Sequence, residues 1–193
     1  CLRILRRHGN RIGYESGFTI YDPEDQKAVI RRILKNMNLN EKMWTPRTVL
    51  AAISAAKNDL IGPDDYQRAA RGDYAKEMIA RLYAEYEQEL LLNQAMDLDD
   101  ILRKCVHLFA VNPDILEKYQ DQFRYIMVDE YQDTNTAQYQ LIHQLSGMFG
   151  NICVVGDDDQ SINKFRGANI RNILDFEKDF PDAVVIRLEE NYR

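Results

Sequence analysis

Two adjacent carboxylates, Asp129 and Glu130, directly follow a short apolar run from Tyr125 to Val128. The β-branched and aromatic content of that run, and its abrupt change to acids, predict a buried parallel strand with the acids at its carboxyl end. One carboxylate there can bind Mg²⁺, and its neighbour can orient a water or take its proton. The alternative is that both are ordinary loop acids. Under either interpretation, Asp133 or Thr134 is a candidate N-cap for the helix that follows.

A second apolar run, Ile152 to Val155, is followed by Gly156 and three consecutive acids, Asp157 to Asp159. Gln160 comes next, and its amide can both donate to and accept from a phosphate or a water. A third predicted strand, Ala183 to Leu188, is followed after three residues by Tyr192 and Arg193. An aromatic ring can stack on a nucleotide base, and an arginine can neutralise phosphate charge during transfer.

An aromatic residue between two cations, Lys164, Phe165 and Arg166, lies between the second and third strands. Such a triplet suits single-stranded nucleic acid, because the ring stacks on a base while the cations face phosphates. A surface loop with one buried phenylalanine is the alternative interpretation.

The elements that must position these residues alternate between strand and helix. Helices are predicted from Ala137 to Leu145 and from about Ile170 to Phe176, between the three strands. This alternation predicts an α/β fold with a parallel sheet, and right-handed crossovers place the strand ends on one edge. The carboxylates, Gln160 and Arg193 are therefore expected to converge.

The first half of the chain has a different pattern. Residues 10–92 predict an all-helical unit with one short extended piece, Phe18 to Tyr21, and one long helix, Tyr66 to Leu92. Asp22 and Asp97 are predicted N-caps. Four arginines and no acid occur in residues 1–12, which fits either a phosphate-facing patch or a solvated helix end.

Composition is that of a soluble globular protein. The 193 residues are 45% hydrophobic and 29% charged, with a net charge of −6, so bulk charge does not point to a polyanionic partner. Three dispersed cysteines indicate a reducing, cytoplasmic compartment, and no apolar run approaches the ~20 residues that span a bilayer, so no membrane partner is expected. Because the sequence opens at Cys1 inside a helical pattern, we expect it to be a piece of a longer protein.

Taken together, the strand-end segments resemble three successive helicase motifs of the UvrD/PcrA/Rep family of superfamily 1 DNA helicases, in the family's order and at its spacing. The helical part carries two further similar segments, and the resemblance spans essentially the whole chain, closest to the PcrA/UvrD branch. The matching segments are Val128–Asp133, Val155–Ile162 with Phe165–Gly167, Leu188–Arg193, Ile53–Lys57 and Leu98–Ile101.

The resemblance implies a motor that couples Mg-ATP hydrolysis to 3′ to 5′ translocation on single-stranded DNA and to duplex unwinding. The pathway would be DNA repair, replication or plasmid maintenance, and protein partners stay unspecified. It also implies a partial RecA-like parallel sheet with flanking helices, plus an all-helical inserted subdomain. The expected divisions are a RecA-domain helix end over 1–9, the insertion over 10–92 and the C-terminal part of the first motor domain over 93–193.

By position in the motifs, the resemblance assigns a role to each nucleotide-site residue. Asp129 would hold Mg²⁺, and Glu130 would orient or deprotonate the attacking water. Gln160 would sense the γ-phosphate of ATP and couple it to DNA. Tyr192 would stack on adenine, and Arg193 would contact the γ-phosphate. Glu130, Gln160 and Arg193 would thus be catalytic.

On the DNA side, Phe165 would stack on a base with Lys164 and Arg166 beside it. The sequence departs from the family at Asn163, where an aromatic residue is common, so one base platform is missing or supplied differently. It also contains no Gly-x-x-x-x-Gly-Lys-Ser/Thr loop, which in the family lies further towards the N-terminus. The chain therefore holds half a nucleotide site and is expected to be inactive alone.

Two functions of other classes remain open. The missing phosphate loop also fits a non-catalytic DNA- or protein-binding module. A metal-dependent nuclease built on Asp157 to Asp159 with Asp129 and Glu130 is the third hypothesis, but it leaves Gln160 and the aromatic-basic triplet unexplained.

Overall fold

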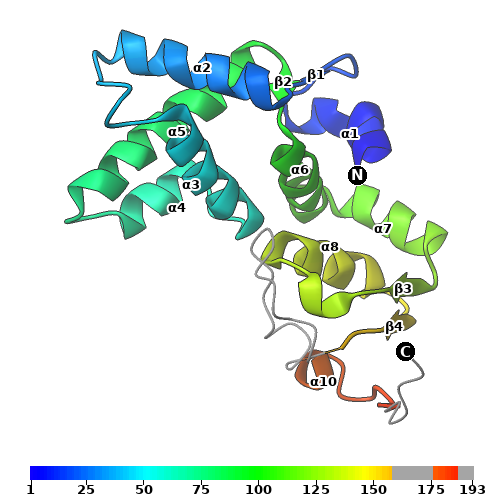
Figure 1. Cartoon of the computed structure of the whole chain (residues 1–193). Helices are drawn as coiled ribbons and strands as arrows, with labels where there is room; N and C mark the ends of the chain where they lie inside the picture. Colours follow the sequence, from blue (N-terminus) through cyan, green and yellow to red (C-terminus); the bar gives the residue numbers. More distant parts are fainter. Residues whose placement is uncertain (158–175, 187–193) are drawn as a thin grey trace.

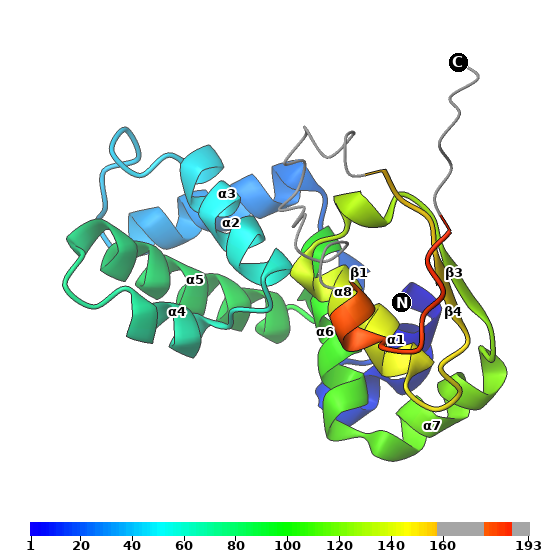
Figure 2. The ribbon, with the colours of Figure 1, turned by 90° about the horizontal axis from the view of Figure 1, so that it is seen from below.

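The computed structural model describes residues 1–157 and 176–186, and in it two groups of elements are visible (Figure 1). One group is purely helical and consists of α2 to α5. The other combines helices with a small parallel sheet, and in Figures 1 and 2 its helix α8 lies between α6 and the strands. The bounds of the first group are α2 Pro23–Asn36, α3 Pro46–Asn58, α4 Pro63–Ala69 and α5 Tyr74–Leu92. Those of the second are α1 Leu2–His8, α6 Leu98–Val111, α7 Pro113–Gln122, β3 Ile126–Val128, α8 Thr136–Ser146, β4 Ile152–Val154 and α10 Phe176–Asp179.

Side-chain caps start the helices where the sequence predicts them. Asp22 accepts hydrogen bonds from the backbone N–H groups of Glu24 and Asp25 at the start of α2. Asp97 forms a reciprocal capping box with Asp100 at the start of α6. These bonds satisfy N–H groups that have no partner within the helix. Both predicted caps are confirmed.

The helical group, α2 to α5, is built around one apolar core. Its members recur at helical spacing along α2, α3 and α5, so each helix turns one stripe inward. Tyr83 and Tyr86 are fully buried in it, as expected for core tyrosines. The remaining fully or nearly fully buried members include Ile30, Ile33, Leu34, Val49, Ile53 and Leu82.

The predicted single helix from Tyr66 to Leu92 is wrong, because the chain turns between α4 and α5. Gly72 has φ +85°, a left-handed conformation that breaks helical geometry and favours glycine. Asp73 then caps α5 by accepting from the N–H groups of Ala75 and Lys76. A glycine followed by an acid is a stop and a start signal, and the apolar periodicity across it conceals the break.

The helical group departs from and returns to one point in the second group. Strand β1, Thr19–Ile20, pairs in parallel with β2, Ala95–Met96, with Thr19 opposite Ala95. Residues 10–92 thus contain a two-residue strand in addition to their helices. Behind this pair, α1, α6 and α7 share a second core that includes Leu5, Phe18 and Phe109.

Strands β3 and β4 pair in parallel, with Ile126 opposite Ile152, which confirms a parallel α/β arrangement at this place. The prediction that β3 is buried on both faces is wrong. Met127 is 79% exposed, and its neighbour across the pair, Cys153, is exposed as well. Alternate residues of a strand face opposite sides, so Ile126 and Val128, which are half-buried, face the covered side.

The third predicted strand, Ala183 to Leu188, is not observed in the part that the structure describes. Residues 183–186 have no strand conformation, and the backbone N–H of Ala183 bonds to the turn carbonyl of Phe180. Val184 and Ile186 are at least 80% exposed. Apolar, β-branched residues form a strand only when a neighbouring strand accepts their backbone bonds. Residues 187 and 188 lie outside the described residues.

Within the described ranges, no helix combines the length and the apolar character needed to cross a membrane.

Candidate functional site

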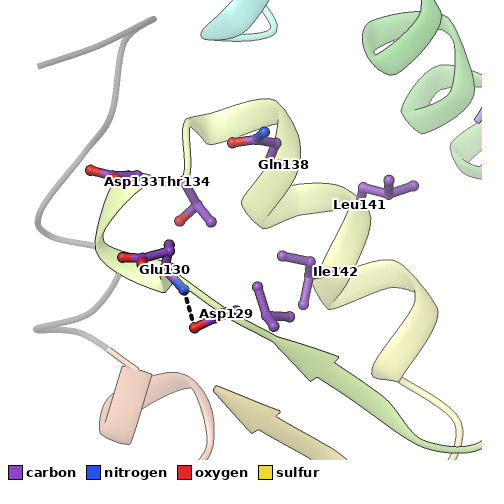
Figure 3. Close-up of a pocket in the computed structure, with 8 residues that line it drawn as sticks. Asp129, Glu130, Asp133, Thr134, Gln138, Leu141 and Ile142 are labelled. Carbon is purple, nitrogen blue, oxygen red and sulfur yellow. Dashed lines mark hydrogen bonds between the residues drawn. The ribbon is translucent and has the colours of Figure 1, made fainter. Parts of the chain in front are cut away.

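A strained loop follows β3 and carries the two predicted acids. Asp129 and Glu130 come directly after Val128, and Glu130 has φ +50° and ψ +42°. The backbone N–H of Glu130 donates to Oδ1 of Asp129 at 2.9 Å (Figure 3). Left-handed backbone in a residue other than glycine costs about 1–3 kcal/mol and concentrates at functional sites. A 3₁₀ turn, Tyr131–Asp133, follows at once.

A hollow of about 330 Å³ lies beside this loop (Figure 3). Acids form one part of its wall, and the half-buried side chains of Leu141 and Ile142 from α8 form another. Asp129, Glu130 and Asp133 are exposed, so a ligand can reach them from solvent. The full lining is Val128, Asp129, Glu130, Asp133, Thr134, Gln138, Leu141 and Ile142.

Gln132 holds the carboxylate of Glu130 and was not singled out from the sequence. Its Nε2 donates to Oε2 of Glu130 at 2.6 Å, and its Oε1 accepts from the backbone N–H of Asp157 at 3.0 Å. Gln132 is 1% exposed, so its amide is held inside the protein while the acid that it contacts is exposed. One buried amide thus joins the acid after β3 to the loop after β4. Its position two residues beyond Glu130 is the only sequence signal for this role.

The cap of α8 differs from both sequence candidates. Asn135, rather than Asp133 or Thr134, accepts from the backbone N–H of Gln138 at 2.9 Å, and Gln138 returns a bond to the N–H of Asn135. Thr134 instead donates from Oγ1 to the carbonyl of Tyr131 at 2.7 Å. The 3₁₀ turn takes up Tyr131 to Asp133, so the N-cap falls at Asn135, one residue beyond Thr134. Helix α8 itself begins at Thr136, one residue before the predicted start at Ala137.

Tyr131 ties the loop to a distant segment. Its backbone N–H donates to the carbonyl of Val155 at 2.9 Å, and its ring meets that of Phe176 edge to face at 5.6 Å. The side chain is fully buried, and this burial, with smaller contributions from Tyr139 and Asp179, raises the pKa of Tyr131 to about 12. The loop therefore has a fixed backbone between β4 and α10.

The donor set at the hollow fits Mg²⁺. Carboxylate oxygens are hard ligands, and Mg²⁺ is usually held by one or two of them together with waters and substrate phosphates. Asp129 and Glu130 supply that number without a further protein cage. Among residues 1–157 and 176–186, no three side chains of the His, Cys, Asp or Glu type come together as a metal-binding group.

The other predicted site residues lie outside the described part of the chain. The structure brings Asp129 and Glu130 together at one hollow and leaves the convergence of the remaining residues as a prediction. These are Gln160, Asn163, Lys164, Phe165, Arg166, Tyr192 and Arg193.

The amino-terminal arginines are partly engaged within the protein. Arg11 pairs with Asp114 at 3.2 Å and bonds to Asn112. Arg6 donates to backbone carbonyls of Ser16 and Phe18 and lies over the Phe18 ring. Two of the four arginines of a possible phosphate-facing patch therefore have structural partners.

A buried charge cluster joins α3, α5 and α6, and no local pattern in the sequence indicates that its members meet. Nζ of Lys57 lies 2.7 Å from carboxylate oxygens of Glu87 and Asp97 and 2.8 Å from Asp100. The Lys57 side chain is completely buried. Further members, which complete what we call the Lys57 cluster, are Tyr86, Arg103 and Lys104.

The three acids control the charge of the buried lysine. Burial alone would lower the pKa of Lys57, but Asp100, Asp97 and Glu87 outweigh it and hold this pKa well above its usual value. Burial opposes ionisation of Glu87 too, yet Lys57, Lys104 and Arg103 hold the pKa of Glu87 below its usual value. The ionised pair is therefore the state that this packing stabilises.

Known proteins similar to this chain were found along its whole length. The family described as "UvrD/REP helicase N-terminal domain" matches residues 1–181. Proteins named "ATP-dependent DNA helicase PcrA" are 53% identical in Staphylococcus aureus (strain Mu50 / ATCC 700699) and 52% identical in Bacillus subtilis (strain 168), each over all 193 residues. The chain spans 26% of the length of each of these relatives. On the strength of the family match, this chain belongs to the UvrD/REP helicase N-terminal domain family.

Proposed function

We propose that this chain is the part of an ATP-dependent DNA helicase that contributes one wall of the nucleotide site. The observation that carries the proposal is the pair Asp129 and Glu130 at the carboxyl end of a parallel strand, beside an open hollow. In parallel α/β sheets, ligands bind at that edge. The names of the relatives support the same activity.

In this proposal the two acids divide the work. Asp129 holds Mg²⁺, and Glu130 orients the attacking water or takes its proton. A Mg²⁺ ion held there would supply positive charge to offset the charge that develops on the phosphates. Gln132 keeps the Glu130 carboxylate in one orientation through its 2.6 Å bond. The strained backbone at Glu130 turns the two neighbouring acids in different directions.

The DNA-facing and adenine-facing roles rest on the motif resemblance. Gln160 senses the γ-phosphate, Tyr192 stacks on adenine and Arg193 contacts the γ-phosphate. Phe165 stacks on a base of single-stranded DNA, with Lys164, Arg166 and Asn163 along the same track. The parent protein translocates 3′ to 5′ on that strand and unwinds duplex DNA. In this proposal the parent protein acts on DNA in the cytoplasm.

A substitution at Glu130 tests the proposal in the complete gene product. Glu130→Gln keeps the size of the side chain but cannot accept a proton, so DNA-stimulated ATP hydrolysis should fall roughly 10²- to 10⁴-fold. ATP binding, followed with a fluorescent analogue, should persist. Glu117→Gln, at an exposed position of α7, is the matched control and should leave both unchanged. Equal hydrolysis by Glu130→Gln and the unsubstituted protein would overturn the assignment.

The isolated chain should hydrolyse ATP very slowly. It contains no Gly-x-x-x-x-Gly-Lys-Ser/Thr loop, so it has no backbone cradle or lysine for the ATP phosphates. Turnover measured with and without single-stranded DNA checks this. A rate of ~1 s⁻¹ or more, which is typical of enzymes, would show that the chain carries a complete site.

A second candidate function is a non-catalytic binding module, and the exposed apolar residues of β3 favour a protein-contact form of it. Met127 and the preceding Tyr125 are 79% and 82% exposed. A salt-dependent titration with a single-stranded oligonucleotide separates the two candidates. Binding that weakens in Phe165→Ala supports the motor surface, whereas absence of binding at every salt concentration supports protein contact.

A further inference from the structure

The end of α3 touches the start of α8, close to the acids. Nδ2 of Asn135 donates to Oδ1 of Asn58 at 2.6 Å, and both side chains are at least 92% buried. A second bond lies beside it, from Oγ1 of Thr136 to Oδ1 of Asp59 at 3.1 Å. The pair thus joins the helical group, α2 to α5, to the loop that carries Glu130.

Each side-chain nitrogen and oxygen of this pair makes at least one hydrogen bond. While its nitrogen donates to Asn58, the oxygen of Asn135 caps α8 by accepting from Gln138. The nitrogen of Asn58 donates to the carbonyl of Ser54 at 2.8 Å and to Oδ1 of Asp99 at 3.2 Å. Because a buried amide that loses a partner is costly, the two side chains hold each other in one orientation.

Asn58 has a rigid base on which to act. The preceding residue, Lys57, is fixed by three carboxylates from α5 and from the start of α6. Asn58 itself reaches α6 through Asp99. The last turn of α3 is therefore anchored on two sides before it meets α8.

The loop between Glu130 and Asn135 is short and is attached to other parts of the protein at Tyr131, Gln132 and Asn135. Gln132 binds the backbone of Asp157 at the β4 side, and Asn135 binds Asn58 at the α3 side. The five residues that span Tyr131 to Asn135 include the 3₁₀ turn and leave little slack. A shift of Asn135 would therefore be passed on to the backbone of Glu130.

We propose that Asn58 is a positioning residue for ATP hydrolysis, which acts through Asn135 to hold the Glu130 carboxylate in its working orientation. The inference rests on the proposed function. Asn58 touches neither nucleotide nor metal in this scheme. It makes the position of the loop from Glu130 to Asn135 depend on the helical group, α2 to α5.

Two variants break the bond in different ways. Asn135→Ser keeps a side-chain oxygen that caps α8, because serine caps helices about as well as asparagine, but it is too short to reach Asn58. Asn58→Ala removes the acceptor from the other side. Asn40→Ser is the matched control, because the side chain of Asn40 accepts from the backbone N–H of Lys42 far from the loop.

The main measurement is steady-state, DNA-stimulated ATP hydrolysis by the complete gene product. Each of the two variants should lower kcat roughly 2- to 30-fold, the range spanned by couplings through packed networks. KM for ATP should stay within about twofold, because the groups that bind ATP in the ground state are unchanged. If a variant merely folded less well, the fraction of active protein would fall. The KM for ATP and the dependence on DNA concentration of the folded protein would stay the same. Activity is therefore expressed per titrated nucleotide site.

The double variant decides whether one bond is responsible. If both residues act through the bond they share, the double variant Asn58→Ala with Asn135→Ser should have the same kcat as the single variant with the lower kcat. The inference would be overturned if the two single-variant reductions in kcat multiplied in the double variant, or if kcat were unchanged in Asn135→Ser. It would also be overturned if the KM for ATP rose by the same factor as kcat fell. An inactive unsubstituted protein would instead contradict the proposed function.

The 193-residue chain itself supplies an independent readout. The backbone N–H of Asp133 donates to the carbonyl of Glu130 at 2.9 Å inside the 3₁₀ turn. Hydrogen exchange at this amide should be several times faster in Asn135→Ser and Asn58→Ala than in Asn40→Ser. Equal exchange in all three variants would show that the bond does not hold the loop.

Discussion

The helical group, α2 to α5, and the strand-end region treat polar and apolar groups in opposite ways. In the helical group the buried Lys57 is paired with Glu87 of α5 and with two acids at the start of α6, and the large apolar side chains are packed in a core. In the strand-end region the acids Asp129 and Glu130 are exposed, and so is Met127 on one face of the sheet.

The difference indicates a structural role for the paired charges of the helical group and a ligand-binding role for the acids of the strand-end region. A buried charge that is already paired is held in one geometry and is not accessible to a ligand. An exposed carboxylate on a fixed loop can bind one. Gln132 shows how the strand-end region fixes its acid without burying it, by placing the neutral partner inside and the charged one outside. Rigidity and accessibility are thus combined at one residue pair.

The largest effect should come from removing the buried lysine. Lys57→Gln removes the cation shared by Asp97, Asp100 and Glu87, of which Glu87 keeps Arg103 and Lys104, and breaking such a buried pair costs about 3–5 kcal/mol of the free energy of unfolding. Lys27→Gln is the matched control, since Lys27 lies the same 2.7 Å from Glu24 but at the surface, where a pair contributes about 0–1 kcal/mol. Urea unfolding of both variants measures the contrast, and similar losses would remove burial as its cause.

Apolar truncation should separate the two regions next. Leu82→Ala empties a fully buried site in the helical core and should cost about 2–5 kcal/mol. Met127→Ala shortens a side chain that is 79% exposed and should change stability by less than about 0.5 kcal/mol. Thermal and urea unfolding of the chain check both. A large loss in Met127→Ala would mean that this face is covered in solution.

Alkaline pH should weaken the helical group through Lys57. Because the folded-state pKa of Lys57 is raised, its contribution is fully present below the unfolded lysine pKa of about 10.4 and is lost as pH rises through the folded value. In that window the unfolding free energy should fall by up to about 1.4 kcal/mol per pH unit on account of this group. Burial also raises the pKa of Tyr83, so tyrosine ionisation adds a loss in every variant.

Comparing the unsubstituted chain with Lys57→Gln isolates the lysine. Urea unfolding at several values between pH 9 and pH 12 should give a steeper decline for the unsubstituted chain. Parallel declines would show that the pKa of Lys57 in the folded chain is not raised above its unfolded value.

A smaller loss than that from the buried lysine or leucine should arise at the corner between α4 and α5. Gly72→Ala forces a side chain onto φ +85° in otherwise open space and should cost roughly 1–2 kcal/mol. Gly17→Ala, which also meets open space but has no positive φ, should be neutral or stabilising by up to about 1 kcal/mol. Equal melting temperatures for the two variants would show that the corner relaxes without strain.

Local signals made part of this architecture predictable. Asp22 and Asp97 are caps because of side-chain chemistry within three residues, and β3 and β4 are short apolar runs that end at turn residues. The acids at the end of β3 were identifiable for the same reason.

Long-range contacts were not predictable from spacing. The Lys57 cluster unites residues from three helices, and nothing local to Lys57 marks it as buried. The amide pair of Asn58 and Asn135 is 77 residues apart in the chain. The break at Gly72 was hidden by apolar periodicity on both sides, and residues 183–186 have strand-like composition but pair with no strand in the part of the chain that the structure describes.

The short ladder between β1 and β2 has a consequence for how such a chain can change over time. Thr19 and Ala95 are direct partners, so the polypeptide departs towards α2 and re-enters α6 at adjoining positions. Material between two adjoining positions can grow, shrink or be exchanged while the remaining backbone keeps its course. The two-residue β1–β2 pair is thus a site at which evolution, or a protein engineer, can replace the helical group, α2 to α5, by another set of helices.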